Sequence, residues 1–388
     1  MSCPLSESRR MKLAFLVTSL LRAACTAPLF ILLAACSGTA GPRPAELPPD
    51  PALLRLKQSW VAQPPAKAFP LRAKANGEQI TLTGADGTVM AIDGRSGREL
   101  WRAQAGAPVD VGAGSDGAVT AVVTKDNQLI VLQDGKPAWT GRLDARAFTP
   151  PLVAGRRVFV HTADRTISAW DAQTGQRLWS RSRTGDRLVL SHPGVLIAVR
   201  NTIVTNLGAR LVGLAPNDGA PLWEAPLATS RGVTEVENMI DLTGGVSRVG
   251  DSVCARAYEA TIGCVDASRG QLLWRRTARG AEGLAGDADT LYGSETDGAL
   301  MAWRRADGEA AWRSEPLKHR QLLAPVIFGG ALVVAERSGT LHLASHSDGS
   351  LLGRVTPDDT TIDAPPVLAG NTVVVVTRKG VYGYRAAE

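Results

Sequence analysis

Residues 169–179 read AWDAQTGQRLW, and versions of this phrase return along most of the 388-residue chain. The shared pattern is Ala/Leu-x-Asp-x-x-Ser/Thr-Gly-x-x-x-Trp, in which a glycine lies four residues before a tryptophan. Successive tryptophans of the series are 41, 38, 40, 44, 51 and 38 residues apart. Self-similarity at a period near 40 residues indicates a repeat architecture. The tryptophans of the series are Trp60, Trp101, Trp139, Trp179, Trp223, Trp274 and Trp312.

The segments between the tryptophans predict short β-strands. Apolar and polar residues alternate in runs such as Arg157–His161 and Asn371–Val376, and turn residues such as Asp86-Gly87 separate the runs. Period-two alternation broken about every ten residues is typical of antiparallel strands joined by tight turns. Each repeat then holds about four strands, and four-stranded sheets bury both faces when they stack radially as the blades of a β-propeller. We expect the repeated tryptophan to fill the gap between neighbouring blades.

The two ends of the chain set the number of blades. Six phrases end in tryptophan, and a further copy ends in Gly353 instead. The last strands, Val373–Tyr384, have no phrase after them, and Ser59–Val61 is a strand with no blade before it. Pairing of these two ends would close the ring and remove a free sheet edge. We therefore predict an all-β, eight-bladed propeller over residues 57–388; seven blades is the alternative if the irregular region 180–260 holds fewer.

The N-terminal residues predict export and lipidation. Basic residues precede an apolar stretch, as in a signal peptide, which we assign to residues 1–35; a start at Met11 would give a shorter leader. The segment Leu33–Gly38 resembles the lipobox of bacterial lipoproteins, which implies that Cys36 carries the lipid. The alternative is an ordinary signal peptide with an incidental cysteine. Residues 36–56 are rich in proline and are predicted to be a flexible tether.

The charge of the chain argues against a nucleic-acid partner, and the positions of its cysteines argue against a disulfide. The formal charge is +6, but removal of the first 36 residues leaves 39 basic and 36 acidic residues, and no basic stripe suggests a nucleic-acid partner. Two cysteines, Cys254 and Cys264, flank a predicted hairpin. A two-residue turn at Glu259-Ala260 would place Cys254 opposite Val265, with the two thiols on opposite faces of the sheet. This parity predicts that the two cysteines do not form a disulfide.

The sequence offers no catalytic centre, so we expect no enzyme activity, no cofactor and no metal. The five histidines are scattered, and His342 and His346 would stand about 13 Å apart on one strand, too far to share an ion. Acidic residues of the repeats, such as Asp93, belong to the turn phrase, where carboxylates cap backbone N–H groups. Quinone-dependent dehydrogenases have similar propellers, and such an enzyme, or another periplasmic binding module, is the alternative. Those enzymes resemble much longer chains, and many carry adjacent cysteines and a calcium site.

Two consecutive steps of the series, of 44 and 51 residues, are longer than the others. We expect the extra residues in the links that follow Trp179 and Trp223, at about Ser180–His192 and Glu224–Thr243. Equivalent links of neighbouring blades emerge side by side, so the two insertions should form one raised patch. Apolar residues rimmed by charge are typical of protein-binding sites. Variable loop decoration is the alternative reading.

The lipobox, the tether and the tryptophan-motif propeller together resemble the BamB family of outer-membrane lipoproteins. The likeness covers essentially the whole mature chain and is strongest in His319–Val326 and in Gly339–His342. It implies a non-enzymatic protein at the periplasmic face of the outer membrane, lipid-anchored, that binds the POTRA domains of BamA. Other subunits of the assembly complex are implied partners, and unfolded outer-membrane proteins could add strands to its sheet edges.

The family's contact uses a Leu-x-Leu-Arg stretch and an Asp-x-Asp loop, and both match positions in the two long links. Here a serine replaces the arginine and a threonine replaces the second aspartate. The predicted partner-binding residues are Leu188, Leu190, Ser191, Glu235, Asp241 and Thr243.

Overall fold

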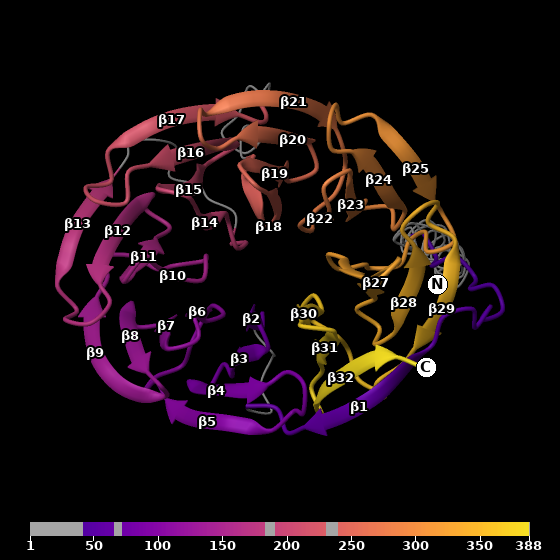
Figure 1. Ribbon diagram of the computed structural model, residues 1–388, viewed down its shortest axis with the longest axis horizontal. Helices are drawn as coiled ribbons and strands as arrows, with labels where there is room; N and C mark the ends of the chain where they lie inside the picture. The colour runs from indigo at the N-terminus through magenta and orange to yellow at the C-terminus, as the bar shows by residue number, and fades with distance from the viewer. Residues whose placement is uncertain (1–41, 66–71, 183–190, 230–239, 388) are drawn as a thin grey trace, which may run out of the picture. The chain divides into compact units, whose positions relative to one another are not determined.

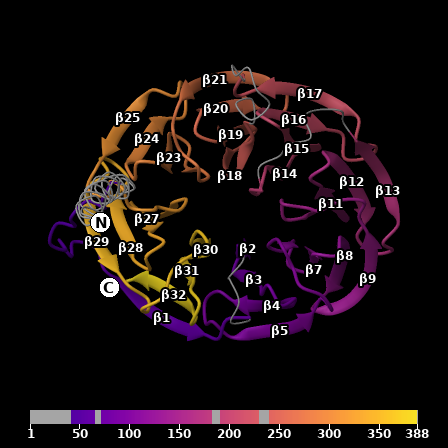
Figure 2. The same ribbon diagram turned by 180° about the vertical axis from the view of Figure 1, so that it is seen from behind.

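The computed structural model describes residues 42–65, 72–182, 191–229 and 240–387. The chain divides into two units, Met1–Arg43 and Pro44–Glu388. In the second unit the described residues form eight antiparallel sheets of four strands each, arranged in a closed ring (Figure 1), and Figure 2 shows the ring from behind. The predicted eight-bladed propeller is confirmed, and the seven-bladed alternative is wrong.

The blades are numbered in chain order. Within each blade, the first strand lies nearest the centre of the ring and the fourth strand lies outermost. Blades 1 and 2 comprise β2 (Lys74–Asn76), β3 (Gln79–Thr83), β4 (Thr88–Asp93), β5 (Glu99–Gln104), β6 (Gly114–Ser115), β7 (Val119–Val123), β8 (Gln128–Gln133) and β9 (Lys136–Arg142). Blades 3 and 4 comprise β10 (Leu152–Ala154), β11 (Arg157–His161), β12 (Thr166–Asp171), β13 (Arg177–Ser182), β14 (Leu196–Val199), β15 (Thr202–Leu207), β16 (Arg210–Leu214) and β17 (Pro221–Pro226).

The second half of the ring repeats this plan. Blades 5 and 6 comprise β18 (Leu242–Val249), β19 (Ser252–Ala257), β20 (Thr261–Asp266), β21 (Gln271–Thr277), β22 (Ala285–Gly286), β23 (Thr290–Ser294), β24 (Leu300–Arg304) and β25 (Ala310–Ser314). Blades 7 and 8 comprise β26 (Val326–Phe328), β27 (Ala331–Ala335), β28 (Leu341–Ser345), β29 (Leu351–Val355), β30 (Val367–Ala369), β31 (Thr372–Val376), β32 (Val381–Ala386) and β1 (Leu56–Ala62).

The hydrophobic core lies between the blades. The second and third strands of a blade are buried on both faces, so their sequences are almost continuously apolar, as in Leu129–Leu132 of β8. Eight clusters of buried side chains are present, and each joins two neighbouring blades; in one of them Val131 of blade 2 packs with Val158 and Trp170 of blade 3. A blade therefore becomes stable only when its neighbours are in place.

The ring closes through the two ends of the chain, as predicted. Strand β1 forms the outermost strand of blade 8, antiparallel to β32, with Lys57 opposite Arg385 and Val61 opposite Tyr382. Because β1 covers the outer edge of β32, the last blade reaches the four strands of the others.

The tryptophans join each blade to the next one. The indole ring of Trp139 on β9 lies against Gly175, in the turn between the third and fourth strands of blade 3, and its Nε1–H donates to Ala172 O at 2.9 Å. A methyl group on Gly175 would lie 2.7 Å from the indole, and the residue has φ of +72°. Glycine is thus required there for both space and backbone conformation. The same pairing of ring and glycine joins Trp60 to Gly97, Trp101 to Gly135, Trp179 to Gly219, Trp223 to Gly270, Trp274 to Gly308 and Trp312 to Gly349.

Gly353 stands where the eighth tryptophan would be, at the junction of blades 7 and 8. The outer strand of blade 8 comes from the other end of the chain, so β32 and β1 have no connecting turn on which an indole could lie. The backbone of Leu54 occupies the space instead. A methyl group on Gly353 would lie 2.3 Å from Leu54 O, and Leu54 N donates to Leu352 O at 3.0 Å.

The cysteine pair differs from the prediction. Cys254 and Cys264 lie directly opposite each other on β19 and β20 and form a disulfide, with their Cα atoms 4.0 Å apart. The turn between the strands has three residues, Tyr258–Ala260, because Ala257 pairs with Thr261. One additional turn residue moves the register by one position and brings the two side chains to the same face. The prediction of unpaired thiols, which assumed a two-residue turn, was therefore wrong.

The last part of the predicted tether region contacts the ring. Ala45 N donates to Lys318 O at 2.9 Å, Leu47 packs against the cluster between blades 6 and 7, and Leu54 is bonded to β29. The chain thus contacts the ring at Ala45, Leu47 and Leu54, within the stretch that the sequence predicts to be a tether. Cys36 lies outside the described residues.

We predict that alanine at Gly175 destabilises the protein more than alanine at Gly155. Both glycines have positive φ and both lie in blade 3, but a methyl group on Gly155 meets no atom within 4 Å. Gly155→Ala should cost about 1 kcal/mol from backbone strain, and Gly175→Ala about 1–3 kcal/mol more from overpacking against Trp139. Denaturant unfolding of both variants measures the difference. Equal losses would contradict the docking role of Gly175.

We predict that loss of the disulfide lowers the unfolding midpoint. The bond closes a loop with a sequence separation of 10 residues, for which loop-closure entropy gives about 2–3 kcal/mol. The Cys254→Ala/Cys264→Ala variant should unfold at lower denaturant concentration than the oxidised protein, and a reductant should have no further effect on it. Alkylation of these two cysteines in the unfolded, unreduced protein would contradict the assignment.

Candidate interaction face

The two faces of the ring carry different connections. Strands alternate in direction, so the links between blades and the turns between second and third strands lie on one face, which we call the link face. The turns that receive the tryptophans lie on the opposite face, the docking face. Backbone hydrogen bonds join links to turns across the link face, as from Ala163 N to Arg146 O at 2.7 Å.

Counted between the strand bounds, the two longest links follow the strands that carry Trp179 and Trp223, as the sequence predicts. The link from β13 to β14 covers residues 183–195 and that from β17 to β18 covers residues 227–241, which are 13 and 15 residues, whereas the others have 7 to 11. Residues 183–190 and 230–239 lie outside the described residues, and the described ends of both links lie on the link face, at the entry to blades 4 and 5. The expectation that the extra residues follow Trp179 and Trp223 is confirmed.

The predicted partner-binding residues are placed unequally. Leu188, Leu190 and Glu235 lie outside the described residues. Ser191 is exposed. Asp241 and Thr243, in contrast, are only 8% and 4% exposed, so neither offers much surface for direct contact with a partner.

These two residues are buried because the second link ends inside the ring. Asp241 O accepts a hydrogen bond from Tyr258 N at 3.0 Å, and Thr243 pairs with Arg256 in the first ladder of blade 5. They hold the end of the link in place against blade 5.

The described ends of the two long links meet at one small cavity. His192 from the first link and Asp241 from the second both line it, together with Phe148, His161 and Arg165, and its volume is about 40 Å³. The ring of His192 also lies 5.9 Å from that of Tyr258 in blade 5. Side chains from blades 3, 4 and 5 and from the two links between them thus come together here.

His161 is the perturbed histidine of this cavity. Burial, reinforced by the nearby positive charge of Arg165, lowers the pKa of His161 to about 4. Its Nδ1 lies 3.2 Å from Thr205 Oγ1. The imidazole is therefore neutral at pH 7 and contributes shape and a hydrogen bond rather than charge.

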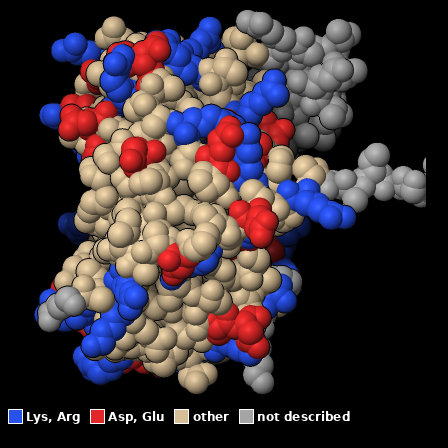
Figure 3. Space-filling view, turned by 90° about the vertical axis from the view of Figure 1, so that its right-hand side faces the viewer, with Lys and Arg blue, Asp and Glu red and all other residues tan. Residues whose placement is uncertain are grey.

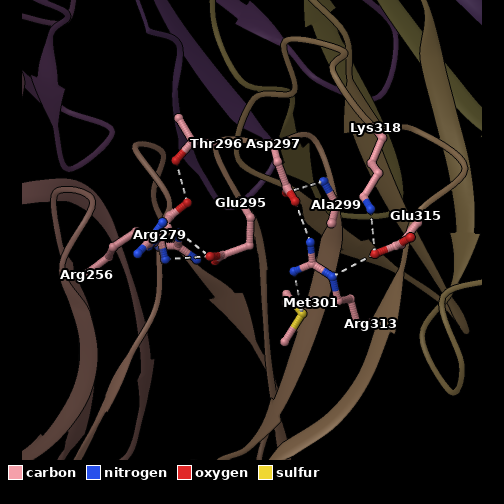
Figure 4. Close-up of polar contacts among 10 residues, drawn as sticks. All are labelled: Arg256, Arg279, Glu295, Thr296, Asp297, Ala299, Met301, Arg313, Glu315 and Lys318. Carbon is pink, nitrogen blue, oxygen red and sulfur yellow. Dashed lines mark hydrogen bonds and ion pairs between the residues drawn. The ribbon is translucent and has the colours of Figure 1, made fainter. Parts of the chain in front are cut away.

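A charge network covers the link face from blade 5 to blade 7 (Figure 4). Arg256 on β19 is fully buried; its Nη1 lies 3.1 Å from both Glu295 Oε1 and Ser294 O, and its guanidinium lies 5.6 Å from the centre of the Trp303 ring. Farther along, Arg313 bonds Asp297 and Glu315, and Lys318 Nζ lies 2.8 Å from Glu315. The network ties the links before blades 6 and 7 to the turns beside them.

Sequence reasoning missed Arg256. The sequence does contain a sign of its burial, because an arginine stands in the otherwise apolar run 253–257 of β19. Gly280 marks the same site from the other side: a methyl group there would lie 1.1 Å from Arg256 Nη1. Burial lowers the pKa of Arg256, against the opposing effect of Glu295, and the ion pair keeps a charge inside the protein.

Ion pairs also span the hub of the ring. Arg72, just before blade 1, lies 3.5 Å from Glu282 in the link before blade 6, and Arg337 in blade 7 lies 3.2 Å from the same carboxylate. Arg72 also donates to Gly244 O of blade 5 at 3.4 Å. Within the described residues, no three His, Cys, Asp or Glu side chains are grouped so that they could hold a metal ion.

Comparison with known proteins agrees with this architecture. A family model described as outer membrane protein assembly factor BamB matches residues 85–314. A protein of that name from Burkholderia pseudomallei is 35% identical over 369 residues, which cover 93% of this chain and 97% of the relative. The chain belongs to the BamB family. The BamB protein of Bordetella pertussis is 32% identical, over 87% of this chain and 89% of that protein.

Solved structures share the fold. BamB from Moraxella catarrhalis superposes with a TM-score of 0.75 at 22% identity, over 85% of this chain and all of that one. Quinohemoprotein alcohol dehydrogenase from Comamonas testosteroni gives 0.65 at 14% identity, over 85% of this chain and 76% of the enzyme. The resemblance to the BamB family is thus confirmed, whereas the enzyme shares only the propeller. Of the residues described, none belongs to a helix long and apolar enough to cross a bilayer.

We predict that His161 makes the protein less stable in mild acid. Below pH 6.5 the unfolded chain takes up a proton that folded His161 accepts only near pH 4, so stability should fall as pH drops through this window, by at most about 1.4 kcal/mol per pH unit. His161→Asn should flatten this part of the profile. Denaturant unfolding between pH 4 and 7 measures both proteins, and equal slopes would contradict the prediction.

Proposed function

We propose that this BamB-family chain is a non-enzymatic scaffold, lipid-anchored at the periplasmic face of the outer membrane. It binds the POTRA domains of BamA within the assembly complex and assists insertion of β-barrel proteins. The observation that carries the proposal is the match over nearly the whole chain to relatives named as outer membrane protein assembly factors. The leader and Cys36 supply the anchor.

The link face of blades 3 to 5 supports a binding role. Two adjacent links are longer than the other described ones, and their described ends line one cavity with His192 and Asp241. Long links on a rigid scaffold are where binding residues concentrate. In this proposal Leu188 and Leu190 are the apolar anchors, and Ser191 and Glu235 lie at their polar rim. Asp241 and Thr243 act from beneath by fixing the second link.

An oxidoreductase role receives less support. The quinohemoprotein enzyme is 14% identical and extends well beyond the shared propeller. At the hub of this ring, Arg72 and Arg337 both form ion pairs with Glu282. These contacts join blades across the hub, which favours a structural role for its charged residues.

The binding proposal predicts that Leu188→Glu together with Leu190→Glu weakens binding to the POTRA domains of the cognate BamA. Central apolar anchors are worth about 2 kcal/mol or more, so affinity should fall at least about 30-fold. Leu222→Glu is the matched control, because Leu222 is 53% exposed on the outer strand β17 of blade 4. Interferometry with the folded variants measures the affinities.

Full affinity of the folded double variant would remove the leucines from the interface. If the unmodified chain itself fails to bind the POTRA domains, the proposed partner is wrong.

A further inference from the structure

We propose that Arg320, Glu336 and His342 form a latch that pins the N-terminal segment to blade 7. The latch fixes the point at which the lipid tether leaves the ring, and so determines which edge of the propeller faces the lipid surface. The membrane-proximal edge is the link face of blades 6 and 7. This inference rests on the proposed lipidation of Cys36, whereas the latch itself rests on contacts of described residues.

Both backbone polar groups of Ala45 are engaged at the latch. Its N–H donates to Lys318 O at 2.9 Å, and its carbonyl accepts from Arg320 Nη2 at 2.7 Å. Leu47, two residues later, packs against the cluster that contains Leu317 and Leu322. The segment is therefore held by a backbone pair and an apolar contact rather than by one surface interaction.

Arg320 is preorganised for this role. Its Nη1 lies 3.0 and 3.1 Å from the two carboxylate oxygens of Glu336, which is 5% exposed as a residue. His342, only 1% exposed, lies with its Nε2 2.9 Å from Glu336 Oε2. A buried carboxylate between an arginine and a histidine fixes the guanidinium, so that Nη2 points to the Ala45 carbonyl without a further loss of side-chain freedom.

The residue before Arg320, His319, has an unusual backbone conformation. His319 has φ of +59°, in the left-handed region that costs a non-glycine residue about 1 kcal/mol. Its N–H donates to Asp297 O, so the charge network of Figure 4 and the latch are joined through the same link.

The pinned segment crosses the rim of the ring. Lys318 and Arg320 belong to the link before blade 7, on the link face, whereas Leu54 is bonded to Leu352 at the start of β29, near the docking face. Figure 1 shows the segment, in indigo, outside β29 before it enters β1. Figure 3 shows this side of the ring, where basic and acidic side chains are interspersed.

The short chain between Cys36 and Ala45 limits how the propeller can be oriented on the lipid surface. Nine residues separate Cys36 from Ala45 in the sequence, which can span at most roughly 30 Å. Without both the hydrogen bonds of Ala45 and the contact of Leu47, the next attachment is Leu54, and 18 residues could span roughly 60 Å from the opposite face. The attachment at Ala45 and Leu47 therefore halves the reach of the tether and starts it from the link face, the face that also carries the described ends of the two long links.

The test uses the full lipidated chain in phospholipid vesicles whose headgroups carry an energy-transfer acceptor. A donor dye is placed on Thr356→Cys, exposed in the link after β29, or on Gln173→Cys, exposed on the docking face of blade 3. Transfer should be efficient from position 356 and weak from position 173. Arg320→Ala should reduce the difference and speed amide hydrogen exchange at Ala45 by about tenfold or more.

Two further variants separate the latch from general instability. Ala45→Pro removes the N–H donor to Lys318 without touching the buried charges, and should reduce the transfer difference in the same direction as Arg320→Ala; its exchange is not compared, because proline has no amide proton. Arg378→Ala breaks an exposed ion pair with Asp363 and should leave both measurements unchanged.

Equal transfer from the two positions in the parent chain would overturn the orientation, and unchanged exchange at Ala45 in Arg320→Ala would overturn the latch. If the chain does not associate with vesicles at all, the lipid anchor of the proposed function fails, and the orientation fails with it. Hydrogen exchange in solution then still decides whether the latch exists.

Discussion

The contact between an indole ring and a glycine turn is the constraint on which the ring depends. At seven of the eight junctions, the outer strand of one blade places its tryptophan on the glycine of the next blade, with no room for a side chain there. Six of these indoles also donate to a carbonyl of the neighbouring blade, at 2.7 to 3.1 Å. The contact combines a large apolar surface with a directional bond, so it fixes both the separation and the rotation of adjacent blades. The eight interblade cores form around it.

The eighth junction shows what the constraint requires. Docking needs a turn between the third and fourth strands, and blade 8 cannot have one, because its fourth strand is the N-terminal β1. The chain has Gly353 in place of tryptophan and fills the space with the backbone of Leu54. The N-terminal segment thus closes the ring in two ways, through β1 in the sheet and through Leu54 at the junction. Its attachment at Ala45 continues this closure along blade 7.

The sequence was sufficient for features that repeat and insufficient for those that occur once. The period of the tryptophans predicted the blades, the closure and the position of the two long links. The disulfide was missed because one residue in the Tyr258–Ala260 turn reverses the facing of every side chain after it, and the sequence does not reveal turn length. The burial of Asp241 and Thr243 was missed because it depends on where the link ends relative to blade 5. Arg256 could have been suspected from its apolar strand, but its partner Glu295 comes from blade 6, 39 residues away.

The docking constraint also explains why the candidate site lies where it does. Every tryptophan–glycine contact uses a turn of the docking face, so a change of length there would disturb the junction between two blades. The links lie at the other ends of the outer strands and carry no such contact. Insertions are therefore tolerated on the link face, and the links before blades 4 and 5, whose described ends line the cavity of His192 and Asp241, are the longest. The same face holds the charge network and the attachment of Ala45. Because the turns of the docking face cannot change in length, the link face is where this chain can carry insertions that a regular propeller lacks.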